Sequence, residues 1–215
     1  MPGKPPNIWG PPLWPYLHAI ARIYDAEGDD TMAEIMLCFF DELRYVLPCG
    51  ICRKSFKVFW SRLRNGMDEA LHGDENEHPA AFVVYLLHDC VNRKLEPEGH
   101  ASSPAFRETL LEALPNDQDD DRLWRFLITM ASNYDSNGEH NKQHHYQAFC
   151  TVLAKLMHVS GRYPRLAAAL QGMLPRTTSA KTQEQWIDLV YSAYARWSRR
   201  PLTRHEAERR FGVCA

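Results

Sequence analysis

Apolar residues recur every three or four positions along nearly the whole chain, which places them on one face of an α-helix. Leu13, Leu17, Ile20 and Tyr24 are one example. No stretch of useful length alternates between apolar and polar residues, as a half-buried strand would. The pattern therefore predicts an all-α protein.

Helix start and stop signals divide the first half of the chain. They predict four helices, over residues 12–25, 31–46, 50–63 and 79–95, and a polar loop over residues 66–78. Thr31 and Glu34 have the spacing of a capping box, and Pro48 ends the second helix. Phe82 is an inward candidate of the fourth helix. Because the links between these helices are short, we expect a four- or five-helix bundle.

The helical pattern begins again after residues 115–121, which contain three consecutive aspartates and are typical of a linker. Residues 123–135 follow residues 13–25 at an offset of 110, and six of the 13 positions are identical. The same offset pairs Phe39 with Phe149. Two unrelated amphipathic helices could share such letters, but the persistent spacing favours an internal duplication.

The second copy lacks the reactive residues of the first. At the offset of 110, Val159 and Arg162 stand where the first copy has Cys49 and Cys52. We therefore predict a first domain over residues 1–114 and a second over 115–215, the second being a degenerate helical bundle without a cofactor.

Composition places the chain among ordinary soluble proteins. Of its 215 residues, 45% are hydrophobic and 24% are charged, and the net charge is -2. This charge gives no basic field for nucleic acid. No apolar run reaches the roughly 18 residues of a membrane-spanning helix, and residues 1–12 lack the apolar core of a signal peptide. We expect a cytoplasmic protein that binds neither membrane nor nucleic acid.

One pair among the six cysteines stands out. The cysteines are Cys38, Cys49, Cys52, Cys90, Cys150 and Cys214. Cys49 and Cys52 form the one C-x-x-C pair, at the predicted start of a helix, where free amide groups and the helix dipole favour a thiolate. Such a pair can be a redox couple, half of a zinc site, the active site of a thioredoxin-like domain, or two buried thiols.

The context of the pair narrows these alternatives without deciding between them. No second cysteine pair lies at zinc-finger spacing, and the strand that a thioredoxin-like domain requires is missing. Redox chemistry and buried structural thiols remain about equally supported by the pair alone.

Three blocks of the first half, taken together, resemble a known family. They are Trp9-Gly10-x-x-x-Trp14-x-x-Leu17-His18, then Cys49-x-x-Cys52, then His88-x-x-Val91-Asn92-x-x-Leu95. In order and approximate spacing they are similar to the signature blocks of the Erv/ALR family of FAD-linked sulfhydryl oxidases. The resemblance covers residues 9–97, which is less than half of the chain.

The resemblance implies a role for each matching residue. Cys52 would lie beside the flavin of FAD, and Cys49 would be the outer sulfur that meets the client thiol. Cofactor contacts would come from Gly10, Trp14, His18, Tyr24, His88, Val91, Asn92, Lys94 and Leu95. Of these, Trp14 and His18 would line the flavin, the matched residues of the fourth helix would hold the adenosine, and Lys94 or Arg93 would meet the pyrophosphate.

The implied activity is the oxidation of dithiol protein substrates, such as a thioredoxin-like carrier, with O2 as the acceptor and hydrogen peroxide as the product. The order of the two halves is most like members from large DNA viruses, which implies host cytoplasm or the virion. Family members commonly pair through two helices. This chain could therefore form a homodimer, or its second half could act as an internal pseudo-partner.

Several positions depart from the family pattern. Asp89 stands where the family has asparagine, Pro97 stands where a lysine is frequent, and Cys90 lacks its usual structural partner. No second C-x-x-C is present as a shuttle, which leaves Cys214 as a lone candidate. These departures put the cofactor contacts and the electron route in question.

Two other functional classes stay open. One is a metal-binding helical interaction module that uses the cysteine pair and histidines. His140 and His144 have the spacing of a metal-binding pair, although a polar helix face is the commoner origin of this pattern. The other is a structural scaffold with idle cysteines.

Overall fold

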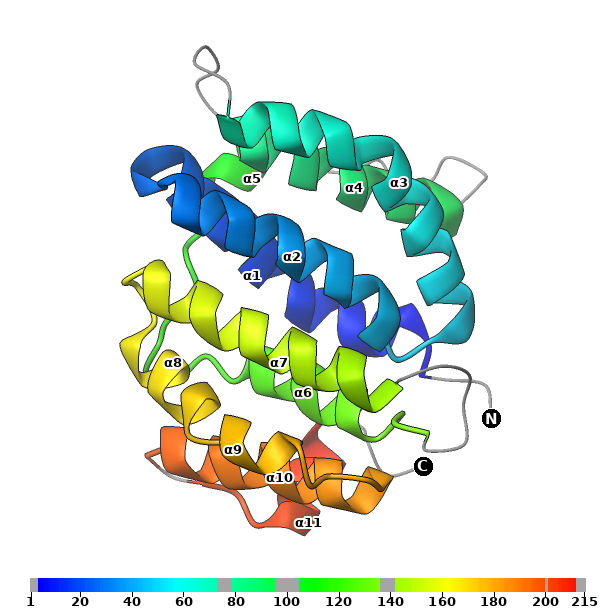
Figure 1. Cartoon of the computed structure of the whole chain (residues 1–215), viewed down its shortest axis with the longest axis vertical. Coiled ribbons are helices and arrows are strands. Elements are labelled where there is room, and N and C mark those ends of the chain that lie inside the picture. The colour runs from blue at the N-terminus through cyan, green and yellow to red at the C-terminus, as the bar shows by residue number, and fades with distance from the viewer. Residues whose placement is uncertain (1–3, 73–78, 96–104, 136–141, 200, 212–215) are drawn as a thin grey trace.

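The computed structural model describes residues 4–72, 79–95, 105–135, 142–199 and 201–211, and these ranges contain helices and no strand (Figure 1). The all-α prediction is confirmed. The helices are α1 (Pro6–Glu27), α2 (Asp30–Val46), α3 (Gly50–His72), α4 (Pro79–Leu95), α5 (Phe106–Leu111), α6 (Arg122–Ala131), α7 (Lys142–Val159), α8 (Pro164–Gln171), α9 (Leu174–Thr177), α10 (Gln183–Trp197) and α11 (Arg204–Arg210).

Helices α1 and α4 lie side by side and carry most of the predicted cofactor residues. The α4 boundaries agree with the prediction. Its first turn is fixed by Asp25 at the end of α1, whose carboxylate oxygens accept hydrogen bonds from the amides of Ala80 and Ala81, each at 3.0 Å. The carboxylate satisfies two amides that a helix start leaves unpaired. This contact sets the position of α4 relative to α1.

Two predicted helix boundaries were wrong. Helix α1 begins at Pro6 rather than at residue 12, because Trp9 is buried in the core and its packing outweighs the cost of the internal prolines. Helix α3 continues through the predicted polar loop to His72. Met67 and Leu71, one helical turn apart, are buried and carry the apolar face past residue 66.

The predicted capping box of α2 does not form. The helix begins one residue earlier, and the carboxylate of Asp29 accepts a hydrogen bond from the Met32 amide at 2.8 Å. Aspartate is at least as good an N-cap as threonine, so the adjacent residue takes the role.

The expectation that Phe82 points inward was also wrong. Its side chain is 45% exposed and lies against α5, with its ring 5.2 Å from that of Phe106. Helix α5 therefore covers a face of α4 that the sequence pattern assigned to the core.

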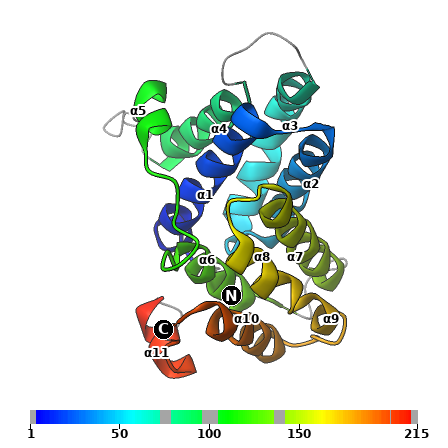
Figure 2. The same ribbon diagram turned by 90° about the vertical axis from the view of Figure 1, so that its left-hand side faces the viewer.

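The second half repeats the packing scheme of the first (Figure 2). In the first half α1 packs on α4 and α2 packs on α3, and in the second half α6 packs on α10 and α7 packs on α8. Between the halves, α1 packs on α6 and α2 packs on α7. The internal duplication stays a prediction, and this correspondence is the observation that favours it.

The contact between the halves is closed by aromatic side chains. Phe39 of α2 and Phe149 of α7, which the offset of 110 pairs, lie with their ring centroids 5.4 Å apart, and both are buried. Such a meeting of equivalent residues is what a twofold-related pair would show. One hydrophobic core runs through both halves.

The predicted linker is held firmly in the described structure. The Tyr16 hydroxyl donates to the Asp120 carbonyl at 2.9 Å, which ties the segment to α1. The carboxylate of Asp117 accepts from the Arg165 and Leu166 amides at 2.8 and 2.9 Å, which caps α8. The two halves are therefore joined by an ordered connection. None of the described helices combines the length and apolar character needed to cross a bilayer.

Candidate active site

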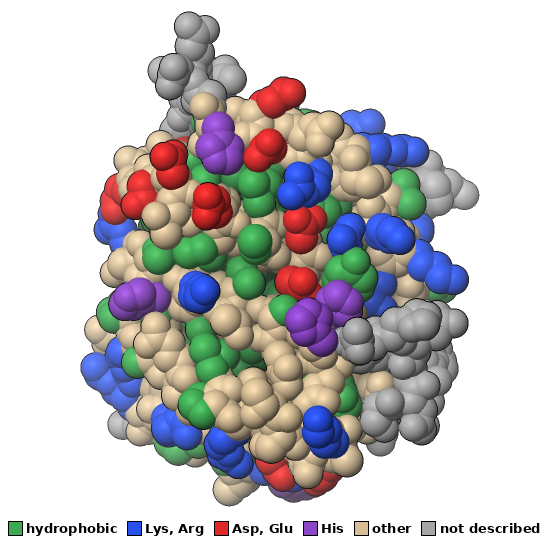
Figure 3. Space-filling view, viewed as in Figure 1, with side chains coloured by type: hydrophobic (Ala, Val, Ile, Leu, Met, Phe, Trp, Pro, Cys, Tyr) green, Lys and Arg blue, Asp and Glu red, His purple; other side chains and the backbone are tan. Residues whose placement is uncertain are grey.

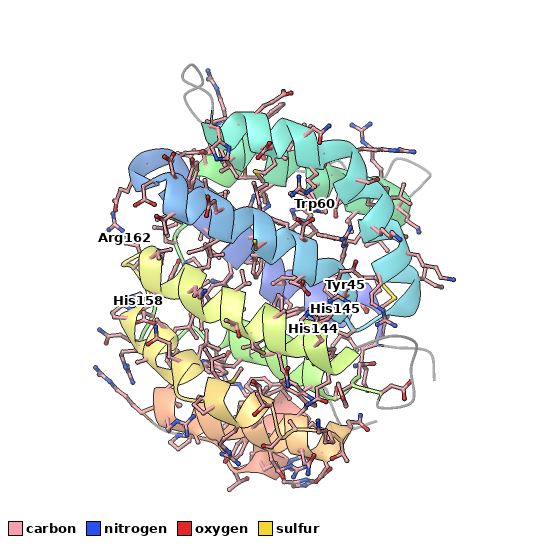
Figure 4. All side chains as sticks on the ribbon, viewed as in Figure 1. Tyr45, Trp60, His144, His145, His158 and Arg162 are labelled. Atoms are coloured by element: carbon pink, nitrogen blue, oxygen red, sulfur yellow. A yellow bond between two sulfur atoms is a disulfide. The ribbon has the colours of Figure 1, made fainter. Side chains whose placement is uncertain are left out.

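Cys49 and Cys52 form a disulfide at the start of α3 (Figure 4). The Cys49 carbonyl accepts the first α-helical hydrogen bond, from the Arg53 amide at 2.9 Å, so Cys49 is the N-cap residue. Its sulfur accepts from the Cys52 amide at 3.2 Å, where a serine oxygen would accept in an ordinary cap. After reduction, the same amide and the helix dipole would stabilise negative charge on the Cys49 sulfur.

The two sulfurs have different surroundings. Cys52 packs against the hydrophobic core, whereas the residue between the cysteines, Ile51, is 72% exposed. The disulfide thus has an inner sulfur beside the core and an outer side that faces an open surface.

A cavity of about 1310 Å³ opens on the disulfide. In the first half its lining includes Leu13, Trp14, Leu17, Cys49, Cys52, Phe56, Phe59, Val91, Lys94 and Leu95. The second half contributes Asn133, Tyr134, Gln183, Ile187, Arg204 and Glu208. Its volume exceeds the roughly 300–1,000 Å³ of an ordinary small-molecule pocket, so it has room for more than one ring system.

A second cavity of about 700 Å³ lies on the other side of the same wall. Gly10, His18, His88 and Asn92 line it, and it shares Trp9, Trp14, Val91 and Leu95 with the larger cavity. The two cavities together form an apolar chamber beside the disulfide and a more polar chamber between α1 and α4.

Three predicted cofactor residues form one aromatic cluster between the chambers. A hydrogen bond of 3.0 Å joins His18 Nε2 to His88 Nδ1, so one imidazole donates to the other. The Trp14 ring stacks on that of His88, with centroids 4.0 Å apart and an interplanar angle of 12°. Burial lowers the pKa of both histidines to about 4, with the charge of Arg22 acting in addition on His18 and that of His18 on His88. Both rings are therefore neutral at pH 7.

The neutral pair makes a pH-dependent contribution to stability. Both pKa values are lower in the folded protein than the ordinary 6.5, so the unfolded chain binds more protons between pH 6.5 and about 4. We expect the contribution to be complete above pH 6.5 and to fall as the pH drops towards 4, by at most about 1.4 kcal/mol per pH unit for each histidine. Urea unfolding at pH 7 and pH 5 should show a smaller decrease for His88→Gln than for the unmodified protein. Equal decreases in both proteins would contradict the expectation.

Other predicted site residues have individual placements. The Lys94 ammonium donates to the Ser55 hydroxyl at the edge of the larger cavity. Tyr24 is not among the residues that line either cavity, and its hydroxyl donates to the Leu71 carbonyl at the far end of α3. The structure therefore does not bring Tyr24 to the other predicted residues.

The departures from the family pattern also have placements. Asp89 forms an ion pair with Arg93, the two atoms being 2.7 Å apart, so its charge is partly neutralised. Pro97 and Cys214 lie outside the described residues, as does His140.

The site residues present fit a flavin nucleotide. The indole nitrogen of Trp9, in the shared wall, is buried without a hydrogen-bond partner among the described residues. A Cβ added at Gly10 would contact Trp14 Nε1 at 3.7 Å and fill part of the smaller cavity. An aromatic chamber beside a disulfide and a chamber with hydrogen-bonding side chains match the two ends of FAD.

Some lining residues were not in the predicted site. Phe56 lies one turn after Cys52 on the same helical face, and this spacing could have identified it. The residues from the second half gave no such signal, because only the contact between the halves brings them to the cavity.

The histidines of α7 have a structural explanation. His145 Nδ1 lies 2.8 Å from a Glu42 carboxylate oxygen, and its ring stacks on Tyr45 at 3.7 Å (Figure 4). These contacts join α7 to α2. Within the described part of the chain, no group of three or more His, Cys, Asp or Glu side chains could hold a metal ion.

Comparisons with known proteins place the chain near one viral protein. No family model matches the chain, and no solved structure matches it. Over 71 residues, which are 33% of this chain, it is 34% identical to a probable FAD-linked sulfhydryl oxidase of Acanthamoeba polyphaga mimivirus. The match spans about half of that relative, 49% of its length.

Proposed function

We propose that this chain is an FAD-dependent sulfhydryl oxidase that forms disulfides in protein substrates through Cys49 and Cys52. The observation that carries the proposal is the position of the disulfide, which opens on an aromatic cavity adjoining the His18 and His88 chamber. The similarity to the viral oxidase supports the same activity.

The thiol chemistry follows from the two environments of the sulfurs. A client thiolate attacks Cys49 on the open side, forming a mixed disulfide and releasing the Cys52 thiolate. A second client thiolate attacks the client sulfur of that bond and releases the Cys49 thiolate. The client has then lost two electrons and become a disulfide, and the Cys49–Cys52 pair has gained them.

The chain's own residues would hold the cofactor across both chambers. Trp14, Leu17 and Phe56 would surround the ring system near Cys52, and His88 and Asn92 would contact the adenosine. When bound, FAD would accept the electron pair from the reduced cysteines and pass it to O2, giving hydrogen peroxide. Because His18 and His88 are neutral, they can offer hydrogen bonds without adding charge.

A visible spectrum of the purified protein, followed by oxygen uptake with dithiothreitol, tests the proposal. We expect a flavin spectrum, bleaching by dithiothreitol in the absence of air, and stoichiometric hydrogen peroxide when air is admitted. A colourless protein with stoichiometric zinc would support the metal-binding alternative. A colourless, metal-free protein without thiol-dependent oxygen uptake would support a scaffold.

A further inference from the structure

The exposed side of α3 combines apolar and basic side chains and starts at the disulfide. This basic face consists of Ile51, Lys54, Lys57, Val58 and Arg62, all of which are exposed. Ile51, which lies between the two cysteines, and Val58 are seven residues apart and lie on one side of the helix. The basic face is therefore continuous with the outer side of the disulfide.

Charge on this part of α3 has a single sign. Residues 50–66 contain five basic side chains and no acidic one, although the whole chain has a net charge of -2. Figure 3 shows blue side chains gathered over this part of the molecule, whereas red ones gather elsewhere.

Part of this positive charge is left without an ion-pair partner. Arg53 donates to the Leu47 carbonyl, and Arg64 pairs with Asp41. Within the described ranges, no ion pair involves Lys54, Lys57 or Arg62. These three cations are available to a partner.

We propose that the basic face docks an acidic segment of the client protein, with apolar residues between its acids, next to the client's reactive cysteine. This inference rests on the proposed function, because the client must bring its thiol to Cys49. Carboxylates of the client would pair with Lys54, Lys57 and Arg62, and its apolar side chains would cover Ile51 and Val58. Complementary charge would mainly raise the rate of encounter and would weaken as salt is added.

The test compares three reduced substrates of the flavin-loaded protein by oxygen uptake. Two are short peptides with the same C-x-x-C and leucines, one flanked by glutamates and the other by lysines. The third is dithiothreitol, which is small and uncharged and needs no docking surface. We expect a kcat/KM at least about tenfold higher for the acidic peptide than for the basic one at low salt, with the difference shrinking in high salt.

The double variant Lys57→Glu/Arg62→Glu reverses two charges of the basic face without touching the disulfide or the cavities. We expect it to lower kcat/KM for the acidic peptide about tenfold, to raise it for the basic peptide, and to leave dithiothreitol oxidation unchanged. The matched control is Lys155→Glu/Arg176→Glu, which makes the same net change at exposed positions of α7 and α9. The control should behave like the unmodified protein with all three substrates.

Three outcomes would overturn the inference while the oxidase activity stands. They are equal rates for the two peptides, an equal loss in the variant and the control, and a loss in the variant that extends to dithiothreitol. Tight binding of a single-stranded oligonucleotide that the variant alone loses, with peptide rates unchanged, would assign the basic face to nucleic acid instead. A protein that fails to oxidise even dithiothreitol would refute the proposed function itself.

Discussion

Replacing Cys52 with serine abolishes thiol-driven oxygen uptake and leaves the flavin bound. Serine nearly preserves the volume of the inner side chain, which packs against the core, so the cavity keeps its shape. The hydroxyl cannot form the disulfide that accepts electrons from the client, so turnover should fall by at least about a thousandfold, comparable to the loss of a catalytic nucleophile. Oxygen uptake with dithiothreitol and the visible spectrum measure the two effects separately.

Cys49→Ser and Cys38→Ser provide the matched comparisons. Serine is a favoured N-cap residue, so Cys49→Ser should keep the start of α3 intact while losing turnover as fully as Cys52→Ser. Cys38 is an exposed free thiol on α2, outside both cavities, and its replacement should leave activity unchanged. Substantial oxygen uptake by Cys52→Ser would show that another sulfur carries the reaction.

The largest expected effect on stability comes from Phe149→Ala. The Phe149 ring is fully buried and contacts Phe39 of the first half and Phe126 of the second, with centroids 5.4 and 6.1 Å away. Removing it leaves a cavity in the core that the halves share, which should cost about 3–5 kcal/mol of unfolding free energy. Because both halves pack against this ring, they should unfold together in one transition at a lower urea concentration.

Circular dichroism during urea titration measures this effect, with flavin fluorescence as a second probe that reports on the first half. Phe82→Ala is the control, since that side chain is 45% exposed and its loss should cost less than about 1 kcal/mol. If Phe149→Ala unfolded in two separate transitions, with the flavin half unaffected, the second half would be an independent domain and the proposed internal pseudo-partner would be wrong.

Local patterns in the sequence determined much of the first half. The 3.6-residue periodicity specified helices because it needs no information about neighbours. It located α4 at its observed boundaries and placed Cys49 and Cys52 at a helix start. The spacing of Trp14 with His18, and of His88 with Asn92, put each pair on one helical face. The pairs could not be joined to each other from sequence, because that depends on how α1 packs on α4.

Tertiary packing decided the boundaries and the faces that local signals left balanced. Asp29 rather than Thr31 caps α2, since both residues suit the role and the difference between them is small. Phe82 lies outward because α5 covers it, and α5 was not predicted. Tyr24 has the spacing of a site residue, yet α1 is long enough to carry it away from both cavities to Leu71.

By itself, the sequence determined that the chain folds into helices and that one cysteine pair sits where a helix start favours a reactive sulfur. Only the tertiary structure decided that the pair opens on two adjoining cavities and that Ile187 and Arg204 of the second half wall the larger one. Helix periodicity and caps act over a few residues, whereas a cavity exists only where surfaces distant in the chain meet. The second half therefore had no visible part in the site until its packing against α1 and α2 was known.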